Sequence, residues 1–178
     1  MGTMNRILNA VGFQSAWWVL VVGAGLGLDR AALVYAVALA CAHVYWSQNR
    51  RRECKIAALV MFIGTVLDST LQASGVIRFN GWAVGPLSPM WLWMLWLLFG
   101  MTLNSSLAFL KTRPLVLSAA LGALLGPMNY IAGAQLGAAS LVVTHAHIAQ
   151  LGLCWLIALP VMVWLAQKMA SGHTLNEP

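Results

Sequence analysis

The chain has 178 residues, of which 61% are hydrophobic and only 8% are charged, whereas roughly a quarter of the residues in a soluble domain are charged. A soluble chain of this length cannot hide so much apolar surface in one core, so the composition predicts a membrane protein. The net charge of +6 does not indicate nucleic-acid binding, because the basic residues stand between apolar runs, as they do where they set membrane topology.

Six apolar segments have the length of about 20 residues that a membrane-spanning helix needs. In chain order they are residues 7–28, 31–47, 56–76, 89–110, 115–134 and 140–166. The predicted fold is therefore all-α: a polytopic membrane bundle of six transmembrane helices in a single domain, residues 1–170. A polar C-terminal tail, residues 171–178, follows it.

The Lys and Arg residues near the ends of these segments predict their orientation. Arg30 and Arg78 lie on one side of the predicted membrane, and all the others lie on the opposite side: Arg6, Arg50, Arg51, Arg52, Lys55, Lys111, Arg113 and Lys168. The positive-inside rule places both termini in the cytoplasm.

The third segment carries an acid, Asp68, at membrane depth. Thr65, Asp68, Ser69 and Gln72 recur at positions i, i+3, i+4 and i+7, which puts them on one helical face. A polar face does not lie against lipid, so we expect it to face other helices or a water-filled cavity. At 1.5 Å per residue, Asp68 lies about 18 Å from the cytoplasmic start of its segment, in the outer half of the membrane.

Polar residues at a similar depth on the fifth and sixth segments complete a predicted cluster around this acid. We expect Asp68, Tyr130 and His147 to be the candidate catalytic residues, with Asp68 as proton donor or acceptor. The candidate substrate-binding residues at this depth are Gln72, Asn129 and His145. The alternative is that these groups only join helices through hydrogen bonds.

Three further candidate substrate-binding residues lie on the first and fourth segments: Gln14, Trp17 and Asn104. Gln14 and Asn104 belong to a second polar set nearer the cytoplasm, which either joins helices or continues the path of the first set. The deep tryptophans, Trp17 among them, either pack helices or form an aromatic wall for an apolar ligand.

The sequence predicts neither a metal site nor a cofactor. His145 and His147 stand two residues apart and would point to different sides of a helix, and no CxxC spacing occurs. The phosphate-binding loop, the dinucleotide fingerprint and the zinc-helix motif are also lacking.

Four stretches together carry a resemblance: "NAVGFQSAWWVLVVGA", "LDSTLQASGVIRF", "PMWLWMLWLLFGMTLNSSLAFL" and "GPMNYIAGAQLGA". They resemble a family of small bacterial inner-membrane proteins, the domain of unknown function 2878 family, in order and over nearly the whole chain. The resemblance implies a location in the bacterial inner (cytoplasmic) membrane. Such proteins are often encoded beside lipid-modifying enzymes, so it also implies a membrane lipid and a lipid-modifying enzyme as partners.

Three functions remain open at this point. The first is an accessory or catalytic membrane component that acts on a lipid or another apolar substrate. The second is a non-catalytic assembly subunit whose polar cluster fixes helix packing, and the third is a small proton-coupled transporter with Asp68 as the coupling group. Oligomeric state leaves no signal in the sequence.

Overall fold

The computed structural model describes residues 3–171, so the predicted polar tail lies outside the described residues from position 172 onward. The described chain is mostly helical, with two short strands. They are α1 (Thr3–Gly25), α2 (Asp29–Trp46), α3 (Arg50–Ala73), β1 (Ile77–Phe79), α4 (Met90–Thr102), the 3-10 helix η1 (Ala108–Thr112), α5 (Leu115–Gln135), β2 (Ala139–Leu141) and α6 (His145–Ser171).

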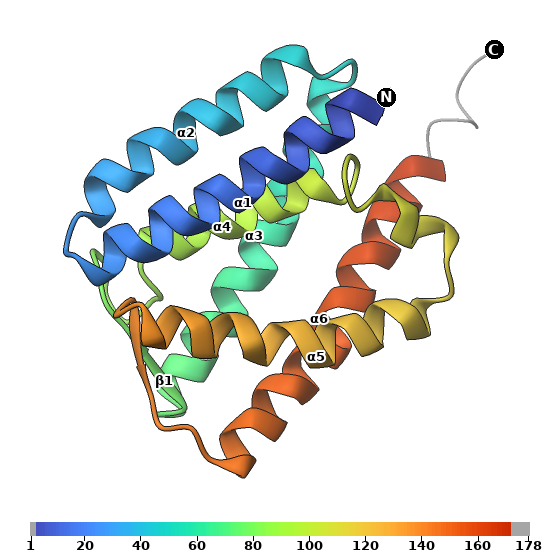
Figure 1. The fold of residues 1–178 in the computed structure, drawn as a ribbon. Coiled ribbons are helices and arrows are strands. Elements are labelled where there is room, and N and C mark those ends of the chain that lie inside the picture. The colour runs from blue at the N-terminus through green and yellow to red at the C-terminus, as the bar shows by residue number, and fades with distance from the viewer. Residues whose placement is uncertain (1–2, 172–178) are drawn as a thin grey trace.

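The helices pack as two groups (Figure 1). In the first group α1 packs on α2, α3 packs on α4, and α4 also contacts α1 and α2. In the second group α5 and α6 pack closely against each other, and α6 also contacts α3 and η1. The all-helical prediction is therefore confirmed for the bulk of the chain, and the space between the two groups is where the candidate site lies.

A two-stranded antiparallel sheet, which the sequence did not predict, joins the two groups at one end. β1 follows α3, β2 follows α5, and Ile77 pairs with Leu141 while Phe79 pairs with Ala139. Each strand has only three residues, which is too short for an alternating pattern to distinguish a strand from a helix.

Four helices are long and apolar enough to cross a membrane: α1 from Asn5 to Gly25, α3, α5 and α6 to Ala170. The remaining two are shorter, because α2 has 18 residues and α4 has 13. The chain is thus a membrane protein with at least four candidate spans among its described residues.

The predicted fourth segment is wrong as a single helix over residues 89–110. α4 ends at Thr102, and the chain continues through turns into η1. The Thr102 hydroxyl donates to the Phe99 carbonyl oxygen, 2.6 Å away, and the Ser106 hydroxyl donates to Asn9 of α1, 2.7 Å away. Such short polar side chains satisfy backbone and neighbouring groups outside a helix, and so favour its end.

The predicted sixth segment also begins too early, at residue 140. Residues 139–141 form β2, and α6 begins at His145, where the Thr144 hydroxyl accepts a hydrogen bond from the His147 backbone N–H over 3.1 Å. A threonine side chain that bonds the first turn in this way is a helix N-cap.

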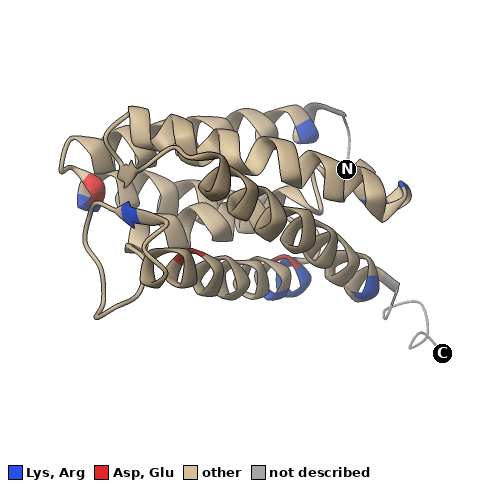
Figure 2. Cartoon of the chain, turned by 90° about the horizontal axis from the view of Figure 1, so that it is seen from below, with Lys and Arg blue, Asp and Glu red and all other residues tan. Residues whose placement is uncertain are grey.

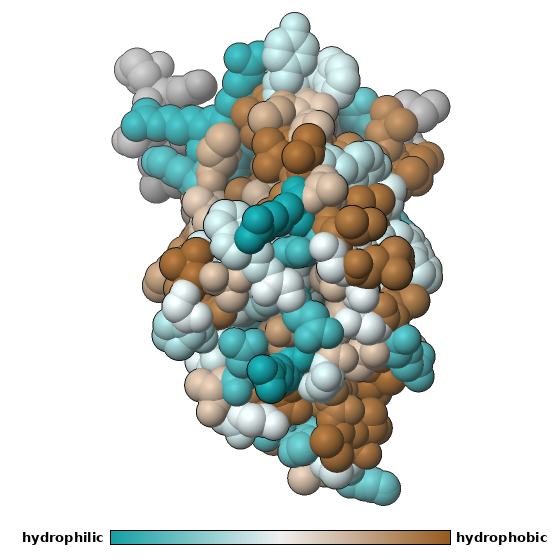
Figure 3. Space-filling view, turned by 90° about the vertical axis from the view of Figure 1, so that its left-hand side faces the viewer, coloured by the Kyte–Doolittle hydropathy of each residue, from teal (hydrophilic) through white to brown (hydrophobic). Residues whose placement is uncertain are grey.

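The Lys and Arg residues are distributed unevenly between the two ends of the molecule. Most lie at the end where α1 begins and α6 ends, whereas Arg30 and Arg78 lie at the opposite end (Figure 2). Figure 3 views the molecule from the left-hand side of Figure 1, where the sheet lies, and shows hydrophilic residues in the middle of this end and hydrophobic residues mainly along its right-hand edge.

Candidate functional site

Asp68 lies on α3 and is completely buried. Gly64 stands one helical turn before it, and a Cβ at this position would collide with the indole ring of Trp96 on α4. The glycine therefore lets the Trp96 ring lie directly against α3, beside the carboxylate. This close packing places an indole donor beside the acid, a role that the sequence analysis did not predict for Trp96.

Two side chains donate hydrogen bonds to the Asp68 carboxylate. The Trp96 indole Nε1–H donates to Oδ2 over 2.6 Å, and the Tyr130 hydroxyl on α5 donates to Oδ1 over 2.5 Å. No Lys, Arg or His side chain in residues 3–171 forms an ion pair with this acid. Asp68 is thus held by two neutral donors, one on each oxygen of its carboxylate.

Trp155 on α6 extends the aromatic surroundings of this acid. Its ring stacks on the Trp96 ring with centroids 5.1 Å apart and planes 22° apart. Its indole Nε1 lies close enough to the Tyr130 hydroxyl to interact with it, but it makes no hydrogen bond of good geometry with any described residue. A buried indole donor therefore lies beside the Asp68–Tyr130 pair.

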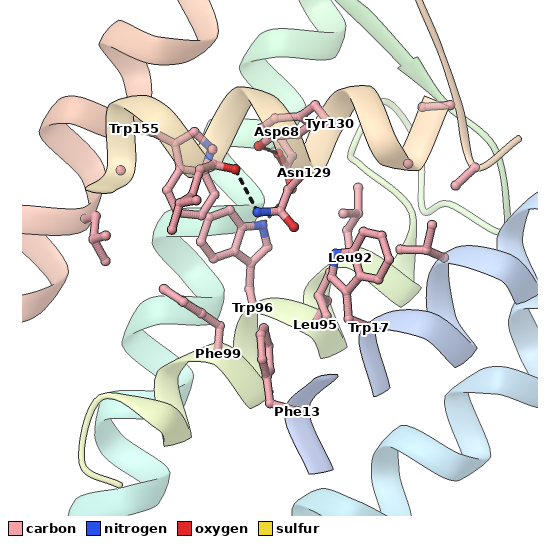
Figure 4. Close-up of a pocket in the computed structure, with 18 of the residues that line it drawn as sticks. Phe13, Trp17, Asp68, Leu92, Leu95, Trp96, Phe99, Asn129, Tyr130 and Trp155 are labelled. Atoms are coloured by element: carbon pink, nitrogen blue, oxygen red, sulfur yellow. Dashed lines mark hydrogen bonds between the residues drawn. The ribbon is translucent and has the colours of Figure 1, made fainter. Parts of the chain in front are cut away.

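A cavity of about 270 Å³ opens beside these side chains, close to the lower end of the volumes of small-molecule sites. Its walls are mainly aromatic and aliphatic and come from α1, α4 and α5 (Figure 4). Asp68 and Tyr130 line it together with two other polar side chains, Gln14 of α1 and Asn129 of α5.

The helices α1 and α5 both line the cavity, Phe13 and Leu121 among their residues. At the end with the sheet the chain at the end of α1 lies against the chain just after α5, since a Cβ on Gly25 would collide with the Leu136 carbonyl oxygen. Toward the other end the two helices diverge (Figure 1).

Five of the nine predicted site residues line this cavity: Asp68, Tyr130, Gln14, Trp17 and Asn129. The predicted proximity of Asp68 and Tyr130 is confirmed by their hydrogen bond. Asn129 does not bond to either of them, because its Nδ2 donates to the Leu125 carbonyl oxygen over 2.8 Å.

Gln72 of α3 was expected in the same cluster as Asp68, but it does not line the cavity. Gln72 accepts a hydrogen bond from the Phe79 backbone N–H over 3.3 Å, and Ser69 accepts one from the Ser88 backbone N–H over 3.0 Å. These two side chains hold the segment between α3 and α4, and only Asp68 of this face lines the cavity.

The two predicted histidines do not lie in the cluster either. His147 is in the first turn of α6, and its Nδ1 lies 2.7 Å from the Val142 carbonyl oxygen, while His145 is exposed. Both residues stand at the start of α6 because the helix begins later than predicted. No group of three or more His, Cys, Asp or Glu side chains that could hold a metal ion occurs in the described chain.

Asn104 lies outside the cavity, at the end of the molecule that carries most of the basic residues. Its Oδ1 accepts a hydrogen bond from Lys111 Nζ over 2.8 Å. The predicted link between this polar set and the Asp68 cluster is therefore not formed by Asn104.

One comparison with known proteins identifies the family. Residues 6–161 match a family described as proteins of unknown function, DUF2878. The chain belongs to this family. No characterised protein and no solved structure matches the DUF2878 chain.

The sequence analysis treated the deep tryptophans of this DUF2878 protein as packing residues or as an aromatic wall, and it did not predict that Trp96 bonds to Asp68. One signal was present: a buried indole N–H needs an acceptor, and Trp96 stands about as far from the outer end of its segment as Asp68 does from its own. Depth matching, which had associated Tyr130 with the acid, would also have associated Trp96 with it.

Proposed function

We propose that this DUF2878 protein binds a lipid or another apolar molecule in the central cavity, as an accessory or catalytic component of a bacterial inner membrane. The observation that carries the proposal is the cavity itself, which has aromatic and aliphatic walls and one buried acid, Asp68. Ligand sites commonly combine apolar walls with a few polar groups that fix orientation.

The proposed arrangement in the membrane is six spans with both termini in the cytoplasm. The basic residues gather at the end of the molecule where α1 begins and α6 ends (Figure 2), which the positive-inside rule assigns to the cytoplasm. Under this arrangement α2 is one of the two shorter spans, and α4 with the turns that follow it, as far as residue 110, is the other.

We expect the ligand to enter from the bilayer between α1 and α5. Residues of both helices line the cavity, and the two helices diverge away from the sheet (Figure 1). The apolar part of the ligand would contact Phe13, Trp17 and Leu95, and its polar group would reach Tyr130 and the Trp155 N–H.

Asp68 is the group that we propose for proton transfer at this site. The Tyr130 side chain lines the cavity and its hydroxyl bonds to Oδ1, so a proton would pass between ligand and acid either directly or through that hydroxyl. Trp96 would hold the second carboxylate oxygen and fix the orientation of the acid.

One observation favours the second candidate, a non-catalytic assembly subunit. Asp68 on α3 bonds to Trp96 on α4 and to Tyr130 on α5, so the acid joins three helices. Interhelical hydrogen bonds of this kind can serve packing alone.

Filling the cavity without disturbing Asp68 would test ligand binding. Gly133 lines the cavity, and the nearest atom to a Cβ there is Val21 Cγ1 at 4.0 Å. Gly133→Leu should occlude the site, whereas the matched control Gly133→Ala should fit. Mass spectrometry of extracts from the purified proteins should find an apolar molecule with the native protein and with Gly133→Ala but not with Gly133→Leu.

The lipid-acting role needs a separate measurement. We expect the lipid composition of a deletion strain to differ from that of the parent under envelope stress, and we expect the gene for Gly133→Ala, but not for Gly133→Leu, to restore it. An unchanged composition would remove the lipid-acting role, and equal recovery of the molecule with Gly133→Leu would place binding outside the cavity.

A further inference from the structure

Two basic side chains converge on one neutral amide at the end of the molecule opposite the sheet. Asn104 Oδ1 accepts from Lys111 Nζ over 2.8 Å and from Arg52 Nη2 over 3.5 Å, the outer limit of a hydrogen bond. Both cations can only donate, so the amide oxygen must face them and the amide nitrogen must point away. The amide has no charge with which to balance the two cations.

Three separate elements hold this group in place. Arg52 lies in the first turn of α3, where its backbone N–H bonds to the Asn49 side chain over 3.1 Å. Asn104 lies in the turns after α4, and Lys111 lies in η1. The Lys111 carbonyl oxygen accepts a hydrogen bond from Gln167 of α6 over 2.7 Å, which ties η1 to α6.

The nearest carboxylate to this group already has a partner. Glu53 Oε2 lies 3.3 Å from His43 Nε2. Burial and the neighbouring Arg52 guanidinium lower the pKa of Lys111, while the charge of Glu53 raises it. Burial is the largest of these effects, and the repulsion between the two cations acts in the same direction.

Two buried donors in the group have no acceptor. Arg52 Nε and Asn104 Nδ2 are both inaccessible to solvent and make no hydrogen bond with any residue in the part of the chain that is described. Leaving a buried donor unpaired costs about 1–3 kcal/mol, and more for a charged group. The like charges and the unpaired donors would both be compensated by an acceptor-rich anion.

We propose that Arg52, Asn104 and Lys111 form a binding site for a phosphate-bearing anion. A guanidinium presents a fixed fork of donors and an ammonium a point charge, a combination that suits the several oxygens of a phosphate better than the two of a carboxylate. The phosphate is either the headgroup of an anionic membrane lipid or free in solution. Arg52, Asn104 and Lys111 do not line the central cavity, so the test of this site does not depend on the proposed function.

Thermal unfolding of the full chain in neutral detergent, followed by tryptophan fluorescence, tests the site. The probes are inorganic phosphate, phosphatidylglycerol and, as the lipid control, zwitterionic phosphatidylcholine. Arg52→Gln and Lys111→Gln should each weaken the anion response about tenfold or more. Arg51→Gln removes the same charge from an exposed neighbour and should change the response less than twofold.

Asn104→Asp provides a second test of the site, which does not require the Arg52 or Lys111 variants to fold. A carboxylate between the two cations should replace the anion, so this variant should unfold at a higher temperature without any probe and respond weakly to all of them. A rise in Tm with both inorganic phosphate and phosphatidylglycerol would identify a general oxyanion site, and a rise with phosphatidylglycerol alone would identify a headgroup site. No rise with either probe, or an equal loss in Arg51→Gln, would overturn the proposal.

Discussion

Tyr130 donates its hydroxyl hydrogen to Asp68 across 2.5 Å, and this bond links residues that stand 62 positions apart in the chain. Trp96 donates to the other oxygen of the same carboxylate. One buried acid therefore connects three helices and also lines the central cavity. Packing and ligand binding depend on the same side chain, so variants must be chosen to separate them.

Asp68→Asn and Asp68→Leu should differ in stability. An asparagine keeps an oxygen for the Trp96 N–H, and its Nδ2 can donate to the Tyr130 oxygen once the hydroxyl turns, so we expect near-native unfolding. Leucine strands both donors at a cost of about 1–3 kcal/mol each. The difference can be measured by unfolding the protein in detergent with increasing dodecyl sulfate and following tryptophan fluorescence. Tyr130→Phe removes only one donor, so it should destabilise the protein less than Asp68→Leu.

The same Asp68→Asn variant separates a proton-transfer role from a packing role. An amide keeps the shape of the acid but does not titrate, so we expect folded, membrane-inserted protein that fails to restore the phenotype of a deletion strain. If Asp68→Asn restored it fully, the assembly function would take precedence over any chemistry at Asp68.

Gly64→Ala should loosen the Trp96 packing. The added Cβ would collide with the Trp96 ring, and forcing extra atoms into a packed core typically costs about 1–3 kcal/mol. Gly133→Ala is the matched control, because its Cβ finds only Val21 Cγ1 at 4.0 Å and alanine favours helix over glycine by about 1 kcal/mol. The same unfolding assay should show a loss for the first variant and none for the second.

Some of the site could be predicted because depth in a membrane is a one-dimensional coordinate that residue counting provides. Counting from the segment ends placed Asp68 and Tyr130 at one level, and the structure joins them. Counting does not give rotation about the helix axis, so Asn129 was expected in the same cluster although it bonds to its own helix.

Other predictions failed because local hydrogen bonds decide where a helix ends. Hydropathy continues through residues 139–141, but strand pairing and the Thr144 cap delay α6, and this moves His145 and His147 to the start of the helix. The role of Gln72 is likewise set by a local hydrogen bond, because its side chain accepts one from the Phe79 backbone N–H in the strand that follows α3.

Lys111 should make stability depend on pH. Its pKa in the fold lies below the ordinary lysine value of 10.5, so between these two pKa values the unfolded chain binds more protons than the folded chain. Stability should therefore rise with pH across this window. We expect Tm in phosphate-free buffer to rise more steeply for the native chain than for Lys111→Gln as the pH approaches 10.5 from below.

An exposed lysine supplies the control for this pH profile. Lys55 lies on the surface of α3, and Lys55→Gln should reproduce the native profile. Parallel profiles for the native chain and Lys111→Gln would contradict the assignment of the pH dependence to Lys111.

Reporter fusions should establish the orientation of the chain. A reporter inserted between Arg50 and Arg52, or fused after Pro178, should report a cytoplasmic position, and one inserted near Asn80 should report an external one. An external signal at either of the first two sites would reverse the proposed orientation.

The partners of Asp68 also bear on how the chain is made. Synthesis proceeds from the N-terminus, so the third helix leaves the ribosome with its acid unpartnered, and a lone carboxylate in lipid is costly. The Trp96 donor follows 28 residues later and Tyr130 another 34 residues after that, 62 from the acid. The third helix should therefore wait at the translocon for the fourth and enter the bilayer with it as a pair, before the last two helices close over them.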